Sequence, residues 1–127
     1  MKTSELTDLA LIWAVAKGEG VHVVMARGGW FVFDSYEDDP PAGVNEYNDD
    51  RWQVYTPSTD WAQGGPILER ECIEISCIHT TGWTPDTWTA RHPQRFRAKG
   101  PTPLIAAMRC FVASKLGDDI EVPEELI

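Results

Sequence analysis

The segment from Thr56 to Pro66 restricts the backbone more tightly than any other stretch of this 127-residue sequence. Its prolines fix φ, its paired glycines permit positive φ, and its Asp and Ser side chains are able to hydrogen-bond their own backbone. Trp61 is its one good core residue. The composition predicts a loop of a single defined shape. Such a loop either locks the fold or holds a ligand, and the residues alone leave both alternatives open.

Length and composition predict one soluble domain over residues 1–127. With 43% hydrophobic residues and six tryptophans, the chain is large enough to bury a core without disulfides or metal. Its three cysteines are an odd number without regular spacing, which is typical of free thiols in a reducing compartment such as the cytoplasm. The longest apolar run, residues 104–116, is too short to span a bilayer and contains Arg109, so we expect no membrane contact.

The first helix is predicted over residues 4–17. Thr3 or Ser4 provides a cap, and Gly18 follows the last turn as a stop signal. Apolar residues lie all around this helix rather than on one stripe. We therefore expect it to be covered on two sides, either within the chain or by a partner subunit.

The second helix is predicted at residues 103–116, and its start and stop signals are both local. Thr102 is the expected cap, Pro103 the first helical residue, and Gly117 the stop. One face of this helix carries only small residues, which would let another backbone approach closely, so a homo-oligomer is one interpretation. These small residues are Ala106, Cys110, Ala113 and Ser114.

Short runs of β-branched and aromatic residues predict strands at residues 21–25, 30–34, 51–55, 72–79 and 87–91. The first two form a hairpin, and the last two form an antiparallel pair. Residues 36–50 are predicted to be a solvated loop, and residues 66–70 a brief helical turn. The expected fold class is α+β, with a small antiparallel sheet of about four to five strands and an N-terminal and a C-terminal helix packed on it.

The formal net charge of −9 argues against broad contact with nucleic acid, so we do not expect nucleic acid as a partner. Residues 91–99 form the one basic segment, which is interpreted as a solvated loop that pairs with the protein's own acids, with local contact to RNA or DNA as the weaker alternative. Acidic runs such as residues 37–39 leave another weak alternative, in which the surface imitates DNA phosphates.

Neither a metal site nor a catalytic centre is predicted. Cys72, Cys77 and His79 are the clustered soft ligands, but alternation along a strand leaves only two on one face, and core cysteines are the favoured interpretation. His22 and His92 have no neighbouring nucleophile in a recognisable motif. We therefore expect no cofactor, and an enzyme is not the favoured class.

The candidate ligand-binding residues are Asp60, Trp61, Gly64, Gly65 and Arg109. In this hypothesis a nucleotide or other anion lies between the loop at residues 60–66 and the C-terminal helix, where Trp61 stacks, the glycines donate backbone N–H groups and Arg109 binds negative charge. The favoured alternatives are structural: a turn at the glycines, anchoring by Trp61, and an ion pair between Arg109 and Asp60 or Asp8. Residues 27–29 could likewise point backbone N–H groups at an anion, although a structural turn is the favoured interpretation there too.

Three segments resemble the NinX-type family of phage and prophage proteins, which is known as a domain of unknown function. They are MKTSEL with WAVAK (residues 1–17), PSTDWAQGGPI (57–67) and GPTPLIAAMRC (100–110). The resemblance implies a small protein encoded by a phage or prophage that acts in a bacterial cytoplasm, and it implies no reaction. Together with the missing catalytic motif, it favours a non-catalytic accessory protein that binds a host or phage macromolecule, most simply a protein.

Overall fold

The computed structural model describes residues 1–25, 31–33, 54–78 and 87–126, and within these ranges it confirms the α+β class. No helix in the described part is long and apolar enough to cross a membrane. The helices are α1 (Asp8–Glu19), α2 (Trp61–Glu71) and α3 (Pro103–Leu116), with short 3-10 turns at Thr3–Glu5 and Glu124–Leu126. The strands are β1 (Val23–Met25), β2 (Phe31–Phe33), β3 (Glu74–Ile78), β4 (Thr87–Arg91) and β5 (Arg97–Gly100).

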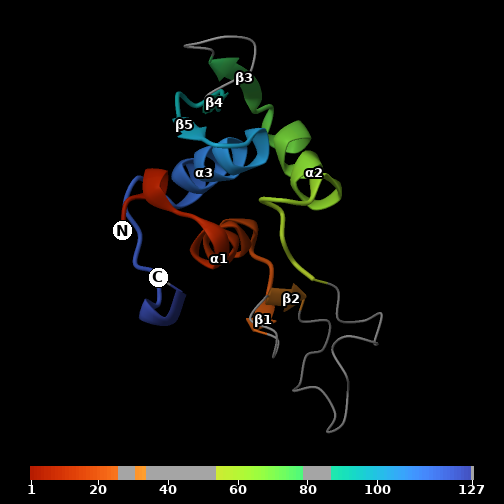
Figure 1. The fold of residues 1–127 in the computed structure, drawn as a ribbon, viewed down its shortest axis with the longest axis vertical. Coiled ribbons are helices and arrows are strands. Elements are labelled where there is room, and N and C mark those ends of the chain that lie inside the picture. The colour runs from red at the N-terminus through yellow and green to blue at the C-terminus, as the bar shows by residue number, and fades with distance from the viewer. Residues whose placement is uncertain (26–30, 34–53, 79–86, 127) are drawn as a thin grey trace, which may run out of the picture.

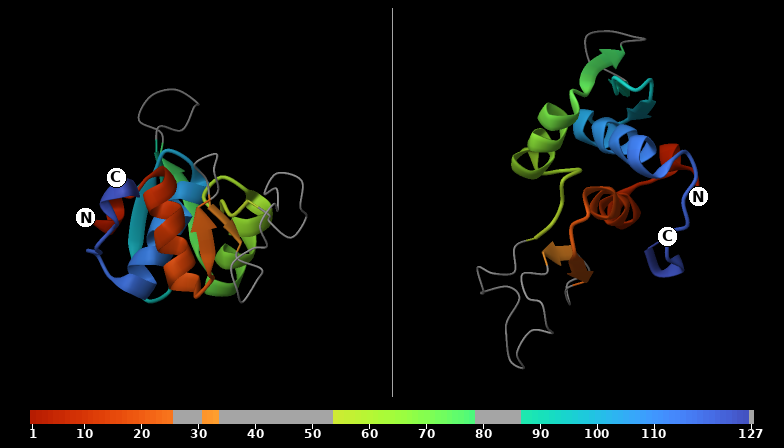
Figure 2. Two further views of the ribbon diagram at one scale, coloured as in Figure 1. Left: turned by 90° about the horizontal axis from the view of Figure 1, so that it is seen from below. Right: turned by 180° about the vertical axis from the view of Figure 1, so that it is seen from behind.

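Helix α3 is the centre of the molecule. Figures 1 and 2 show it between the sheet β3-β4-β5 on one side and α1 on the other, with α2 beside it. The described strands form two antiparallel sheets, a pair β1-β2 and a triplet ordered β3-β4-β5. The predicted hairpin and the predicted pairing of residues 72–79 with 87–91 are both confirmed, with Val24 opposite Val32 and Cys77 opposite Trp88.

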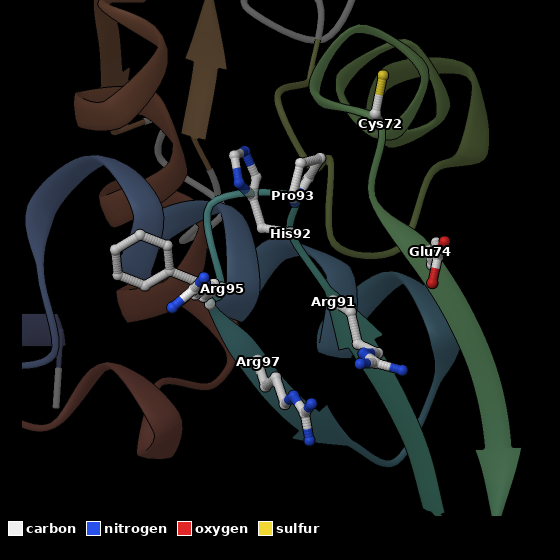
Figure 3. Close-up of a pocket in the computed structure, with 8 residues that line it drawn as sticks. Cys72, Glu74, Arg91, His92, Pro93, Arg95 and Arg97 are labelled. Carbon is white, nitrogen blue, oxygen red and sulfur yellow. The ribbon is translucent and has the colours of Figure 1, made fainter.

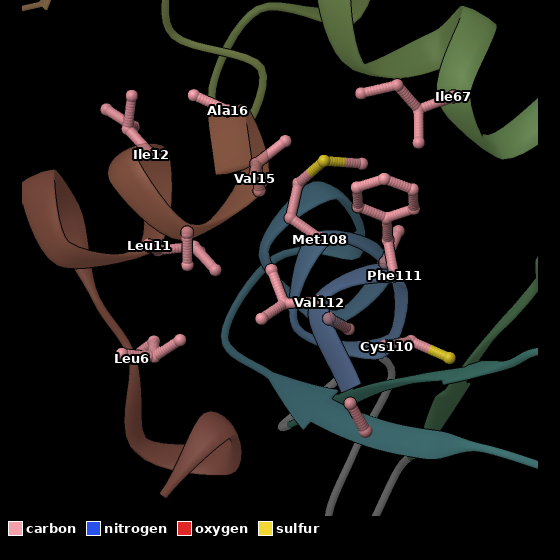
Figure 4. Packing of buried hydrophobic residues seen from close by; sticks show 14 of the residues in the cluster. Leu6, Leu11, Ile12, Val15, Ala16, Ile67, Met108, Cys110, Phe111 and Val112 are labelled. Atoms are coloured by element: carbon pink, nitrogen blue, oxygen red, sulfur yellow. The ribbon is translucent and has the colours of Figure 1, made fainter. Parts of the chain in front are cut away.

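The hydrophobic core forms where α1 and α3 face each other (Figure 4). Leu11 and Val15 of α1 and Met108, Phe111 and Val112 of α3 are all completely buried. Both helices are apolar on more than one side because each is covered on more than one side. The sequence predicted that the first helix is covered on two sides. In the described part, α3 and β2 of this chain contact it.

The small-residue face of α3 packs against the sheet and does not form a free surface. Ala106 and Cys110 are fully buried, and Ala113 nearly so. The approach is close: a Cβ added to Gly100 of β5 would lie 2.7 Å from the backbone nitrogen of Ala106. Small side chains here make room for β5, so this face gives no support for a contact between copies, and the homo-oligomer stays a prediction.

Helix α1 differs from the prediction at both ends. Thr3 lies in a separate 3-10 turn, where its hydroxyl donates to the Gly117 carbonyl at 2.6 Å, and the helix begins only after Thr7. It continues through Gly18 to Glu19 and ends at Gly20, whose φ of 71° is left-handed. Gly18 fits inside the helix because it has no side chain beside the ring of Phe111. A Cβ added at Gly18 would lie 3.0 Å from Cε2 of that ring.

The predicted loop at residues 56–66 is partly wrong, because its second half is the start of α2. Asp60 caps this helix and accepts a hydrogen bond from the Ala62 backbone N–H at 2.9 Å. Pro66 lies inside the helix and does not begin a separate turn. Gly64 fits against both Pro57 and α3: an added Cβ would collide with the Pro57 carbonyl oxygen and lie 2.7 Å from Cδ2 of Leu104.

Helix α3 matches its prediction at both ends. The Thr102 hydroxyl accepts from the Ile105 N–H at 3.1 Å, Pro103 opens the helix, and Gly117 follows it. Of the strand predicted at residues 51–55, only Val54 and Tyr55 are described. Val54 forms an isolated β-bridge, and the Tyr55 N–H donates to the Phe31 carbonyl at 2.8 Å. The predicted loop at residues 36–50 and the turn at residues 27–29 lie outside the described residues.

Candidate functional site

A basic strand hairpin replaces the solvated loop predicted at residues 91–99. Strand β5 pairs with β4 in antiparallel register, so Arg97 lies opposite Arg91 and Lys99 opposite Thr89. Because side chains alternate along a strand, the small residues Ala98 and Gly100 are buried against α3 while Arg97 and Lys99 are exposed on the other face. The cations of this segment are thus arranged on one side of a sheet.

Two arginines lie directly across from each other on this face. Figure 3 shows Arg91 and Arg97 extending from neighbouring strands to the same side. Like charges in opposite register destabilise a sheet. Of the ion pairs within the described ranges, none includes Arg91, Arg97 or Lys99. Glu74 of β3 lies opposite Arg91 on its other side, but Arg97 on the edge strand β5 has only Arg91 across from it. Like charges kept together at this edge are typical of a functional surface.

Arg109 of α3 reaches the edge of the same sheet. Its Nε donates to the Leu6 carbonyl and its Nη1 to the Lys99 carbonyl, both at 2.8 Å. The predicted ion pair with Asp60 or Asp8 is therefore wrong, because backbone oxygens hold the guanidinium. Burial lowers the pKa of Arg109, yet arginine does not lose its proton in proteins. Of five guanidinium N–H groups, these bonds occupy two and leave roughly three to bind an anion.

These side chains line one hollow of about 810 Å³ over the outer face and edge of the sheet, which we term the basic hollow. Its cations are Arg91, Arg97, Lys99 and Arg109. Its hydroxyl groups belong to Ser4, Ser76, Thr87 and Thr89. No acidic and no aromatic side chain is present among its described lining residues. In a chain with 20 acidic residues, such a lining is suited to an anion.

A comparison with models of known protein families matches residues 2–115 to the family described as Bacteriophage P22, NinX. The chain belongs to this family. The resemblance expected from the sequence is confirmed, and the matched range includes every cation of the basic hollow. NinX membership supports a phage-encoded protein and assigns it no activity. No curated protein matches the chain.

A second hollow of about 720 Å³ adjoins the basic hollow in this NinX protein and shares Arg91 and Arg97 with it (Figure 3). Arg95 adds a further cation there, and Glu74, which lies opposite Arg91 in the sheet, adds an acid. On the other side of β5, a hollow of about 350 Å³ is lined by Arg97 and Arg109 together with Asp118 and Asp119. Acidic residues therefore lie near the basic hollow on both sides.

His92 is a structural residue in this NinX protein. Its Nδ1 accepts a hydrogen bond from the Gln94 N–H at 3.1 Å, so the proton is on Nε2, which donates to Glu71 at 3.1 Å. Burial acts to raise the pKa of Glu71, but hydrogen bonds from His92, Arg70 and Lys115 outweigh burial and hold that pKa below its ordinary value. This cluster fixes the β4–β5 turn to the ends of α2 and α3, and so positions the basic strands.

The cysteines are arranged differently from the prediction. Cys72 and Cys77 are exposed rather than in the core, because Cys72 ends α2 in a left-handed conformation (φ 56°) and Cys77 lies near the end of β3. Cys110 is buried, and burial raises the pKa of its thiol to about 11. The described residues contain no group of three side chains able to hold a metal ion, and His79 lies outside them.

The sequence-predicted site residues fall in two places. Asp60, Trp61, Gly64 and Gly65 lie at the start of α2, where Trp61 is 54% exposed and Gly64 is buried against Leu104. Arg109 follows Leu104 by five residues, about 140° around α3, and lines the basic hollow instead. Arg91, Arg97 and Lys99 were noted in the basic segment at residues 91–99 but not chosen as candidate site residues. The alternation of long cations with small residues at 97–100 was the signal for a strand there.

Proposed function

We propose that this phage protein is a non-catalytic binding protein that acts in the bacterial cytoplasm and recognises an anionic group on a host or phage macromolecule. The basic hollow is the recognition surface. The single observation that carries the proposal is its lining of four cations with no acid among the described residues, in a chain of net charge −9. Arginine and lysine gathered against hydroxyl donors suit carboxylate or phosphate oxygens.

A binding role is also supported by the chemistry next to the hollow. His92, which lines the adjoining hollow, has both ring nitrogens occupied by hydrogen bonds and offers no free nitrogen to a substrate. A small anion such as a nucleotide is the alternative occupant, since the volume of the basic hollow falls in the range of small-molecule sites.

The proposal is tested by reversing one charge in the hollow. We expect Lys99→Glu to weaken the binding of a dye-labelled heparin fragment, used as a generic polyanion, by about tenfold at low salt in fluorescence anisotropy. The fold should be retained, because Lys99 is exposed and its backbone carbonyl, rather than its side chain, holds Arg109. Added salt should weaken the wild-type complex.

The matched control is Lys17→Glu, which reverses an exposed cation on α1 that lies 4.8 Å from the ring of Trp13. This variant should bind heparin like the wild type. Equal losses of heparin affinity in both variants would mean that only net charge matters. If Lys99→Glu binds heparin as tightly as the wild type, the basic hollow is not the recognition surface.

A further inference from the structure

We infer that the basic hollow binds an extended acidic segment of a partner protein, lying along β4 and β5 with its carboxylates over Arg97 and Lys99. This inference rests on the proposed function and specifies the partner. The hollow is formed over the outer face of a sheet, whose side chains repeat every second residue. The ligand is therefore expected to present its charges as a row.

The spacing of the cations fits an extended peptide. Arg97 and Lys99 are two residues apart on one strand and on the same face, which separates their Cα atoms by about 6.8 Å. Alternate side chains of an extended peptide repeat over the same distance. Acidic residues at every second position would thus each meet one cation, while Arg109 at the edge offers its remaining N–H groups to a carboxylate or a backbone carbonyl.

The hydroxyl groups of the face suit a peptide backbone. Ser76 and Thr89 lie on adjacent strands, and their hydroxyls are hydrogen-bonded to each other at 2.8 Å. Hydroxyls both donate and accept hydrogen bonds, and a peptide offers N–H donors as well as carbonyl acceptors. A phosphodiester backbone offers only acceptors, so it would use this part of the face less fully.

Nucleic acid fits the surface less well for two further reasons. Binding of single strands depends on aromatic side chains that stack with bases, and the described lining of the basic hollow has none. A nucleic acid also carries a charge at every nucleotide, so the net charge of −9 would repel it more strongly than a short peptide with a few carboxylates.

The experiment compares labelled probes on the full chain by fluorescence anisotropy. The probes are a peptide of alternating glutamate and threonine, its glutamine and lysine counterparts, and oligothymidylate of the same length. We expect the glutamate peptide to bind the wild type, the glutamine peptide to bind at least tenfold more weakly, and Arg97→Glu to lose about tenfold for the glutamate peptide. Arg97→Glu should gain more affinity for the lysine peptide than Lys17→Glu, which has the same net charge, so a gain from net charge alone is accounted for.

The outcomes separate this inference from the proposed function. If oligothymidylate binds more tightly than the glutamate peptide, and Arg97→Glu abolishes that binding, the hollow recognises nucleic acid and the acidic-segment inference is overturned. If neither heparin nor any probe binds in a way that depends on Lys99 or Arg97, the proposed function fails as well. Lys17→Glu should match the wild type with every probe.

Discussion

Replacing Phe111 with alanine is expected to lower the free energy of unfolding by about 3 to 5 kcal/mol, because it opens a cavity beneath both α1 and α2. Phe111, labelled in Figure 4, is the largest fully buried side chain among the described residues. A Cβ added at Gly18 of α1 would lie 3.0 Å from its ring. Denaturant unfolding followed by tryptophan fluorescence measures the loss. Phe111→Leu is the control and should lose much less. A loss below about 1 kcal/mol for the alanine variant would contradict the assignment of Phe111 to the centre of the core.

Gly64→Ala is expected to destabilise the protein by about 3 kcal/mol, at the upper end of overpacking effects, because the new methyl group meets a backbone carbonyl that is not free to rotate away. The colliding atoms are the Pro57 oxygen and Cδ2 of Leu104. The neighbouring glycine provides a matched control: a Cβ at Gly65 meets no atom within 4 Å. Gly65→Ala should raise the free energy of unfolding by about 0.5 to 1 kcal/mol, since alanine favours helix.

Opposite signs for these two glycine variants would confirm that α2 is seated on α3 through Gly64. Equal effects of the same sign would show that the α2 start is not packed in this way. Both variants make the same glycine-to-alanine change at neighbouring positions, so their effects on the unfolded state largely cancel when the two are compared.

The parts of the fold with local signals were predictable from the sequence. Helix α3 was predicted to the residue because Thr102, Pro103 and Gly117 determine its ends without help from the rest of the chain. Strand β4 was also predicted with its bounds, from a short run rich in threonine and tryptophan. In both cases local propensity and the final packing agree.

The start of α2 was not predictable because packing overrides local preference there. Two glycines and a proline are typical of a turn, but Asp60 caps the helix and the absence of a side chain at Gly64 lets it lie against Leu104. The glycine that indicated a turn is instead needed for close contact. Gly18 was misinterpreted for the same reason, since it adjoins Phe111 inside a continuous helix.

The candidate site was only partly predictable. The sequence showed the basic segment at residues 91–99, and it showed Arg109 as a cation that needs a partner. It did not show that β5 places Arg97 and Lys99 on one face, or that Arg109 reaches the Lys99 carbonyl. The residues of the site thus come from separate parts of the sequence, and only the packing of α3 under the sheet brings them together.

Amide chemical-shift mapping by NMR tests the central claim most directly, because it locates binding without any mutation. During titration of the labelled protein with the glutamate–threonine peptide, we predict the largest shifts in β4, β5 and the turn of α3 around Arg109. Shifts that instead cluster at Asp60 and Trp61, at the start of α2, would contradict the basic hollow as the recognition surface and place binding at the site first suggested by the sequence.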